Sequence, residues 1–166
     1  LGIESGSAHV RDGADKHFKD DDIRGVVRAI QGTGISVIGN FIVGLPDDTA
    51  RSMRATLDMA LDLRCEYANF YGAQGYPGSR LFDETPPENL PKAWSGYSQH
   101  SADCTPLPTA TLSSTEVLAF RDAAFQEYFT DPEYLAMIER KFGIGARAGI
   151  EAMAKQPLHR ELLEVA

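Results

Sequence analysis

Short runs of acidic, hydroxyl and glycine residues follow three apolar stretches of the sequence. Glu4 and Ser5 follow the first stretch, residues 44–48 (GLPDD) the second, and residues 74–79 (QGYPGS) the third. Carboxylates in such positions suit the hydroxyl or ammonium groups of a small ligand, and Gly44 allows a ligand to approach the main chain closely. The two aspartates of the second run stand at the start of a helix, where they would repel a phosphate. The pattern therefore indicates a small-molecule site and argues against a phosphate-binding loop.

A purely structural interpretation of the same runs stays open. On that interpretation, Gly44-Leu45-Pro46 is only a tight turn, and Asp48 or Thr49 only caps the helix that follows. Turn and cap signals of this kind are common in globular proteins. Spacing alone does not decide between the two interpretations.

Metal-binding chemistry finds little support in the residue types. The chain has two cysteines, Cys65 and Cys104, and they are far apart in the sequence. The four histidines show no metal-ligand spacing, so we predict no zinc or iron–sulfur ligand cluster within this chain. The cysteines are expected to be free thiols in a reducing cytoplasm.

Composition limits the class of protein and its partners. The 166 residues are 43% hydrophobic and 24% charged, which is ordinary for a globular protein with a sizeable core. The formal net charge is −8 and there is no basic run, which argues against a nucleic-acid partner. No apolar stretch is long enough to span a membrane. We therefore expect a cytoplasmic protein without a membrane partner.

Strands and helices alternate over the first half of the chain. Ile23, Val26, Val27 and Ile30 recur at helical spacing, and the β-branched apolar run that follows is typical of a strand buried on both faces. The alternation predicts βαβ units in a parallel sheet, with right-handed crossovers that place both helices on one face. Open sheets and (β/α) barrels built this way bind ligands at the carboxyl ends of their strands. The expected elements are strands at 1–7, 35–46 and 66–74 and helices at 19–34 and 47–65.

The second half of the chain changes character. Residues 83–112 are rich in proline and polar residues, which predicts an irregular segment that wraps the surface. Ser113 and Glu116 have the spacing of a capping box and predict the start of a helix. Asp131 and Pro132 suit the first positions of another helix, which Gly143 is expected to end. A last helix is expected at about residues 146–155.

Three motifs resemble a known enzyme family. They are GIESGS (2–7), GNFIVGLPDDT (39–49) and NFYGAQGYPGS (69–79). In this order and spacing they resemble the second half of the radical S-adenosylmethionine (SAM) domain, most closely its cobalamin-binding branch of Fe–S oxidoreductases. Residues 120–143 also resemble the helical tail of that branch. The resemblance covers nearly the whole chain, and GIESGS followed by FIVGLP is specific to the superfamily.

The resemblance implies an α/β fold with a partial (β/α) barrel of parallel strands and crossover helices. On this basis residues 1–82 would supply strands four to six of the barrel. Residues 83–112 would form the irregular proline-rich segment, and residues 113–166 a helical C-terminal extension.

The resemblance also implies where SAM would bind. Glu4 and Ser5 match the polar residues that bond the ribose or the methionine part of SAM. Lys16 lies eleven positions after Ser5, where relatives carry a basic residue, more commonly arginine, that meets the SAM carboxylate. A lysine offers a point charge there in place of a bidentate fork.

The other implied contacts surround the adenine. Side chains of the second motif would lie beside the base, its glycine would admit the base, and an aspartate replaces the family's glutamate. The main chain after the third strand would contact adenine, and two tyrosine rings would pack on the base or in the barrel core. These residues are Ile42, Val43, Gly44, Asp48, Tyr71, Gln74, Tyr76, Pro77 and Gly78.

One part of the family's machinery has no counterpart in the sequence. The family holds a [4Fe–4S] cluster on a C-x-x-x-C-x-x-C loop, and the cluster cleaves SAM to a 5′-deoxyadenosyl radical. No such cysteine triplet is present, and the chain begins within a strand without methionine. We therefore expect a C-terminal fragment of a longer radical SAM enzyme, with cluster and any cobalamin bound by residues outside this chain. Its partners would be the upstream half of its own chain and a small-molecule substrate, and the fragment alone would be inactive.

Two other functions stay open at this point. One is a non-catalytic α/β module that packs against a partner, with its acids acting only as caps. The other is a nucleotide-binding barrel fragment without a cluster. Half a barrel would also leave an unpaired edge strand, so we predict that the isolated chain self-associates.

Overall fold

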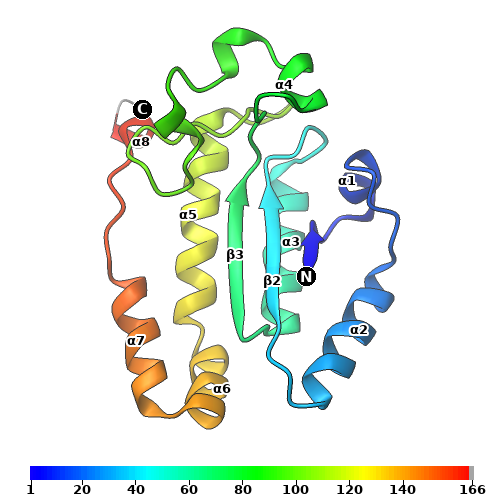
Figure 1. The fold of residues 1–166 in the computed structure, drawn as a ribbon, viewed down its shortest axis with the longest axis vertical. Coiled ribbons are helices and arrows are strands. Elements are labelled where there is room, and N and C mark those ends of the chain that lie inside the picture. The colour runs from blue at the N-terminus through cyan, green and yellow to red at the C-terminus, as the bar shows by residue number, and fades with distance from the viewer. Residues whose placement is uncertain (165–166) are drawn as a thin grey trace.

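The computed structural model describes residues 1–164 (Figure 1). Three strands, eight α-helices and two short 3-10 helices are described within that range. In chain order they are β1 (Gly2–Glu4), α1 (Ala8–Gly13), α2 (Asp20–Gly32), β2 (Ile38–Val43), α3 (Ala50–Leu63), β3 (Tyr67–Gly72), α4 (Arg80–Glu84), η1 (Pro87–Asn89), η2 (Trp94–Tyr97), α5 (Ser114–Thr130), α6 (Pro132–Phe142), α7 (Ile144–Ala154) and α8 (Glu161–Glu164).

The three strands form one parallel sheet in the order β1-β2-β3. The pairing of β2 with β3 is regular from Ile38 opposite Tyr67 to Val43 opposite Gly72. The pairing of β1 with β2 is short and irregular between Gly2 and Glu4. A mixed α/β fold with a parallel sheet and crossover helices is thus confirmed, and all three strands end at the same edge.

Within residues 1–164, helices cover only one face of the sheet (Figure 1). Phe41 and Phe70 stack at 5.5 Å on that face and belong to a core that also contains side chains of α2, α3, α5 and α6. Figure 1 shows α3 behind β2, and no helix of residues 1–164 passes in front of β2 and β3. On the other face Asn69 Nδ2 donates to Asn40 Oδ1 at 2.9 Å.

The prediction that the second strand is buried on both faces is wrong. Its side chains alternate, with Phe41 and Val43 fully buried, Ile42 half-buried and Ile38 52% exposed. The apolar run misled the prediction because apolar side chains, Ile38 and Ile42, occupy positions on the open face as well as the covered one. The candidate site lies at the carboxyl ends of the strands, where it borders this open face.

Most helix boundaries follow the local signals. The predicted capping box is present, since Ser113 Oγ accepts from Glu116 N at 3.2 Å and Glu116 Oε2 accepts from Ser113 N at 2.8 Å. Asp131 caps α6, and Gly143 ends it with φ of +87°. Val26 was expected on the buried apolar face of α2 but is 50% exposed, because the buried face of this helix is centred on Ile23 and Val27. The short helices α1, α4 and α8 were not predicted.

Hydrogen bonds hold the proline-rich segment against the end of β3. Gln99 Oε1 accepts from Gly72 N at 2.8 Å, and Gln99 Nε2 donates to Gly72 O at 3.0 Å. Farther along, Leu107 N donates to Ala73 O at 2.8 Å. These bonds hold the segment beside the carboxyl ends of the strands, where β3 continues into irregular chain.

Membrane insertion through a helix finds no support in residues 1–164. None of the helices described there has both the length and the apolar character needed to cross a bilayer.

Candidate functional site

A cleft of about 360 Å³ lies at the carboxyl ends of β2 and β3. Ligands of parallel α/β folds bind at this edge, and the volume lies within the range of small-molecule sites, about 300–1,000 Å³. Its surface is mainly apolar and aromatic, with two amides. The lining residues are Ile42, Leu45, Tyr71, Gly72, Ala73, Gln74, Tyr76, Leu81 and Gln99.

Four residues predicted from the sequence meet in this cleft. Ile42 and Tyr71 are neighbours on the open face of the sheet, where they pair in register across β2 and β3. Gln74 and Tyr76 reach the cleft from the chain that leaves β3, and Tyr76 Oη donates to Gln74 Oε1 at 2.9 Å. The fold therefore brings together residues from two of the three motifs, although the sequence separates them by about thirty residues.

The Gln74 side chain is buried and already has several partners. Its Nε2 donates to Gly96 O at 2.9 Å, and its Oε1 also accepts from Gln99 Nε2 at 3.1 Å. Gln74 thus shapes the floor of the cleft, and a ligand would meet the main chain and rings around it more readily than its amide.

An aromatic row extends from the mouth of the cleft. The Tyr76 ring lies 5.6 Å from that of Tyr97, which lies 5.8 Å from that of Trp94. Trp94 is 78% exposed. Flat rings in contact with a cleft offer stacking surfaces to a planar ligand.

An acid–base pair stands at the end of the neighbouring strand β1. Lys16 Nζ lies 3.6 Å from Glu4 Oε1, and both side chains are partly exposed. Glu4 has φ of +65°, a left-handed conformation that costs an ordinary residue energy. Strained residues of this kind gather at functional sites, so Glu4 and Lys16 remain candidates for ligand contact.

Ser5 and Val43 turn away from the cleft. Ser5 is fully buried and its Oγ lies 3.1 Å from Thr56 Oγ1 of α3. Val43 packs against Met53 and Val117 on the covered face of the sheet. Both positions were predicted to contact SAM, and both side chains instead contact helices on the covered face. Val43 does so because strand side chains alternate between faces.

Gly44 and Asp48 together form the turn after β2. Asp48 Oδ2 accepts from Gly44 N at 3.0 Å and from Leu45 N at 3.1 Å, and Asp48 Oδ1 accepts from Ser52 Oγ at 2.6 Å. Burial raises the pKa of the Asp48 carboxyl, although these three hydrogen bonds oppose the rise. The cap interpretation of this acid is therefore the one that its contacts support.

Gly44 allows the same turn to form and lets the main chain pack closely against Val117 of α5. Its φ of +80° favours glycine, and a Cβ at this position would lie 2.5 Å from Val117 Cγ1. The space beside its Cα is thus taken by α5, while Gly44 also borders a second hollow of about 270 Å³ beside α4. Pro77 and Gly78 form an exposed turn before α4, which Ser79 caps by accepting from Phe82 N at 3.2 Å.

Sequence reasoning missed five residues of the cleft, which are Leu45, Gly72, Ala73, Leu81 and Gln99. Leu45 lies within the predicted turn and is buried. Leu81 and Gln99 come from α4 and from the irregular segment. Gln99 carried no local signal, because its role depends on its two bonds to Gly72 across a long loop.

The described residues contain no group suited to hold a metal ion. No group of three or more His, Cys, Asp or Glu side chains within residues 1–164 has an arrangement that could hold a metal ion. Cys65 and Cys104 are both buried, and burial raises the pKa of the Cys65 thiol to about 11. Neither cysteine is therefore a ready thiolate ligand.

Comparison with known proteins adds one relationship. No protein-family profile matches the chain. Over 90 residues, 54% of this chain, it is 34% identical to the uncharacterized methyltransferase PH0819 of Pyrococcus horikoshii. The chain is a distant, partial homologue of a methyltransferase. The matched stretch covers only 20% of that protein, so the chain spans about a fifth of its length.

Proposed function

We propose that the chain binds S-adenosylmethionine at the carboxyl ends of β1, β2 and β3, as the SAM-binding half of a radical SAM methyltransferase. The observation that carries the proposal is the convergence of Ile42, Tyr71 and Tyr76 on one cleft at that edge of a parallel sheet. The motif resemblance and the partial homology to a methyltransferase point to the same ligand. On this proposal the sheet is part of a (β/α) barrel completed by other residues of a longer protein.

The cleft fits the adenosyl part of SAM. Ile42 and Tyr71 offer an apolar wall and Tyr76 a ring at the mouth, which together suit a flat base. The exposed turn at Pro77 and Gly78 offers main-chain groups for the edge of the base. These residues would orient the adenosyl group and exclude water from it.

The Glu4–Lys16 pair fits the methionine part. SAM carries an ammonium and a carboxylate on one carbon, and the pair offers one carboxylate and one ammonium that are both partly exposed. Each would exchange a long contact of 3.6 Å for a shorter bond to the ligand. SAM, when bound, supplies an electrophilic methyl group or, beside a cluster, an adenosyl radical.

The described residues do not fit an iron–sulfur cluster. The two cysteines lie in different loops and are buried, and residues 1–164 contain no alternative ligand group. We therefore assign cluster and cobalamin binding, if the longer protein has them, to residues outside this chain. This chain's contribution is to bind and orient SAM.

Calorimetric titration of the chain with SAM tests the proposal. We expect binding that Tyr71→Ala weakens about tenfold or more, since a stacking ring is worth about 1–3 kcal/mol. Ile38→Ala is the matched control, because Ile38 lies on the same open face at the far end of β2. Equal binding of SAM and ATP would favour a nucleotide-binding fragment, and no binding of either would favour the non-catalytic module.

The cluster is tested separately. The coding sequence upstream of residue 1 is expected to encode C-x-x-x-C-x-x-C at a distance suited to three βα units. The isolated chain is expected to turn over no SAM in the presence of a reductant. Turnover by the isolated chain would contradict the assignment of the cluster to other residues.

A further inference from the structure

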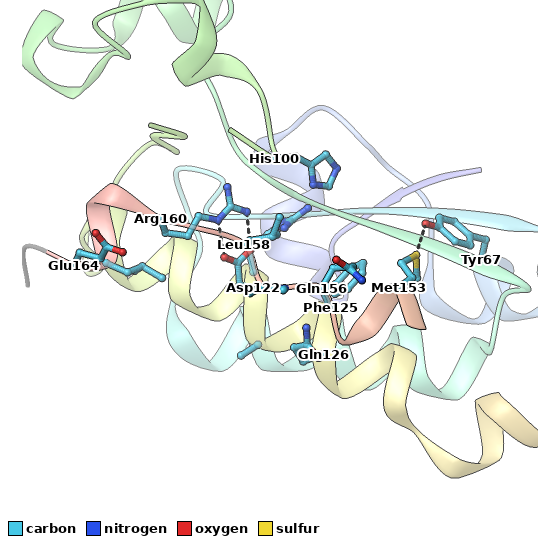
Figure 2. Close-up of a pocket in the computed structure, with 14 residues that line it drawn as sticks. Tyr67, His100, Asp122, Phe125, Gln126, Met153, Gln156, Leu158, Arg160 and Glu164 are labelled. Carbon is cyan, nitrogen blue, oxygen red and sulfur yellow. Dashed lines mark hydrogen bonds and ion pairs between the residues drawn. The ribbon is translucent and has the colours of Figure 1, made fainter. Parts of the chain in front are cut away.

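Another hollow of the molecule lies away from the strand-end cleft. It has a volume of about 570 Å³ and lies between α5, α7 and the chain that follows α7. Figure 2 shows Arg160 beside Asp122, with His100 nearby and Tyr67 and Met153 toward the other end. Nothing in the proposed SAM site uses these residues.

Two buried arginines in this hollow share one bonded acid, Asp122. Asp122 accepts from Arg121 Nη1 at 2.7 Å and from Arg160 Nε at 2.8 Å. Arg121 and Arg160 are each only 3% exposed. These three side chains together carry one net positive charge, and a buried charge is costly unless an opposite charge meets it.

Arg121 also has a donor to spare. Its Nε donates to Phe70 O at 2.8 Å and its Nη1 to Asp122, but its Nη2 has no hydrogen-bond partner among residues 1–164. Arg160, by contrast, donates to Asp122 and to the carbonyls of Gln99 and Ser101. This Nη2 donor of Arg121, which has no protein partner within residues 1–164, belongs to a side chain that lines the hollow.

The rest of the lining is mainly apolar. Phe125, Met153, Leu158 and Leu163 supply hydrophobic surface around the charged cluster. The other acid of the lining, Glu164, is exposed and bonded to His159 Nδ1 at 2.8 Å. A ligand that fits both parts has one negative charge and an apolar body.

We propose that this hollow binds a small monocarboxylate with an apolar body, whose carboxylate accepts from Arg121 Nη2. A carboxylate matches the donors of a guanidinium in shape and charge. It would neutralise the surplus charge of the arginine pair, while its apolar part covers Phe125 and Leu158.

His100 provides an independent local probe. Burial lowers the pKa of this imidazole, and the charges of Arg121 and Arg160 lower it further, against the opposing effect of Asp122. A carboxylate bound beside these groups would raise the pKa of His100. The shift is readable in the imidazole resonances of the whole chain by NMR.

Titration with octanoate tests the proposal. We expect saturable binding by calorimetry, a raised pKa of His100, and much weaker binding of 1-octanol, which has the same tail without the charge. Tyr71→Ala, in the strand-end cleft, is expected to leave octanoate binding unchanged. Equal binding of octanol and octanoate, or no shift at His100, would overturn the proposal.

Variants at Leu158 separate charge from packing without disturbing the arginines. Leu158 is 41% exposed, so substitution there spares the fold, whereas Arg121 also holds Phe70 O. Leu158→Asp is expected to weaken octanoate binding by about tenfold more than Leu158→Asn, because only the aspartate repels the ligand. Equal effects of the two variants would overturn the assignment of an anionic ligand.

Discussion

Two glutamates of this molecule each pair with a lysine, at opposite ends of the parallel strands, in very different surroundings. Glu66 stands just before β3, with a side chain 5% exposed. It accepts from Val37 N at 2.7 Å, is in contact with Gln31 Nε2 at 3.4 Å, and pairs with Lys141. Glu4 stands at the end of β1, where its only ion pair among the described residues is with Lys16 at 3.6 Å.

The difference separates a structural acid from an available one. The partners of Glu66 come from α2, from α6 and from the residue before β2, so other residues of the chain already bond this carboxylate. Glu4 has one long contact and a strained main chain, so a ligand can satisfy it better than the chain does. In barrel folds too, the carboxyl edge of the sheet carries function and the opposite edge carries stability.

Removing the structural acid should have the largest effect on stability. We expect Glu66→Ala to lower the free energy of unfolding by about 2 kcal/mol, because Val37 N loses its buried acceptor and Lys141 its partner. Glu4→Ala should change it by less than about 0.5 kcal/mol. Urea denaturation measures both, and equal losses would refute the distinction.

Acid should reveal the same difference. Burial alone would raise the pKa of Glu66, but hydrogen bonds from Lys141, Val37 N and Gln31 outweigh it and lower the pKa below 4.5. A lowered pKa in the folded state stabilises the fold above pH 4.5, and that contribution is lost as the pH falls toward the folded value. Denaturation at a series of pH values should therefore show a weaker acid dependence in Glu66→Gln. An unchanged pH dependence in that variant would exclude Glu66 as the source.

The sequence predicts most of the helices and strands, but it does not predict which face of the sheet is covered. The parallel sheet, the capping box at Ser113 and Glu116, and the start of α6 at Asp131 all follow local rules that act within a few residues. Which face of β2 stays open does not, because its isoleucines and valines have the same character on both sides. The roles of Ser5 and Gln99 depend on partners distant in the chain, so no local pattern could reveal them.

Relieving the strain at Glu4 should stabilise the fold while harming the site. We expect Glu4→Gly to raise the free energy of unfolding by about 1 kcal/mol, the cost of a left-handed conformation for a residue with a Cβ. The same variant should bind SAM more weakly, because it lacks the carboxylate that we assign to the ligand's ammonium. Denaturation and calorimetry on one preparation measure both effects. A variant that is more stable and binds SAM equally well would remove Glu4 from the site.

Removing the partner of Glu4 should have the smallest effect on stability. Lys16 is 46% exposed and its contact with Glu4 is long, so Lys16→Met should change the free energy of unfolding by less than about 0.5 kcal/mol. SAM binding should nevertheless weaken and lose part of its dependence on salt, since the lysine would meet the ligand's carboxylate. Lys19→Met makes the same charge change three residues away and should leave SAM binding unaffected. If both variants weaken binding equally, overall charge explains the effect and Lys16 has no contact of its own.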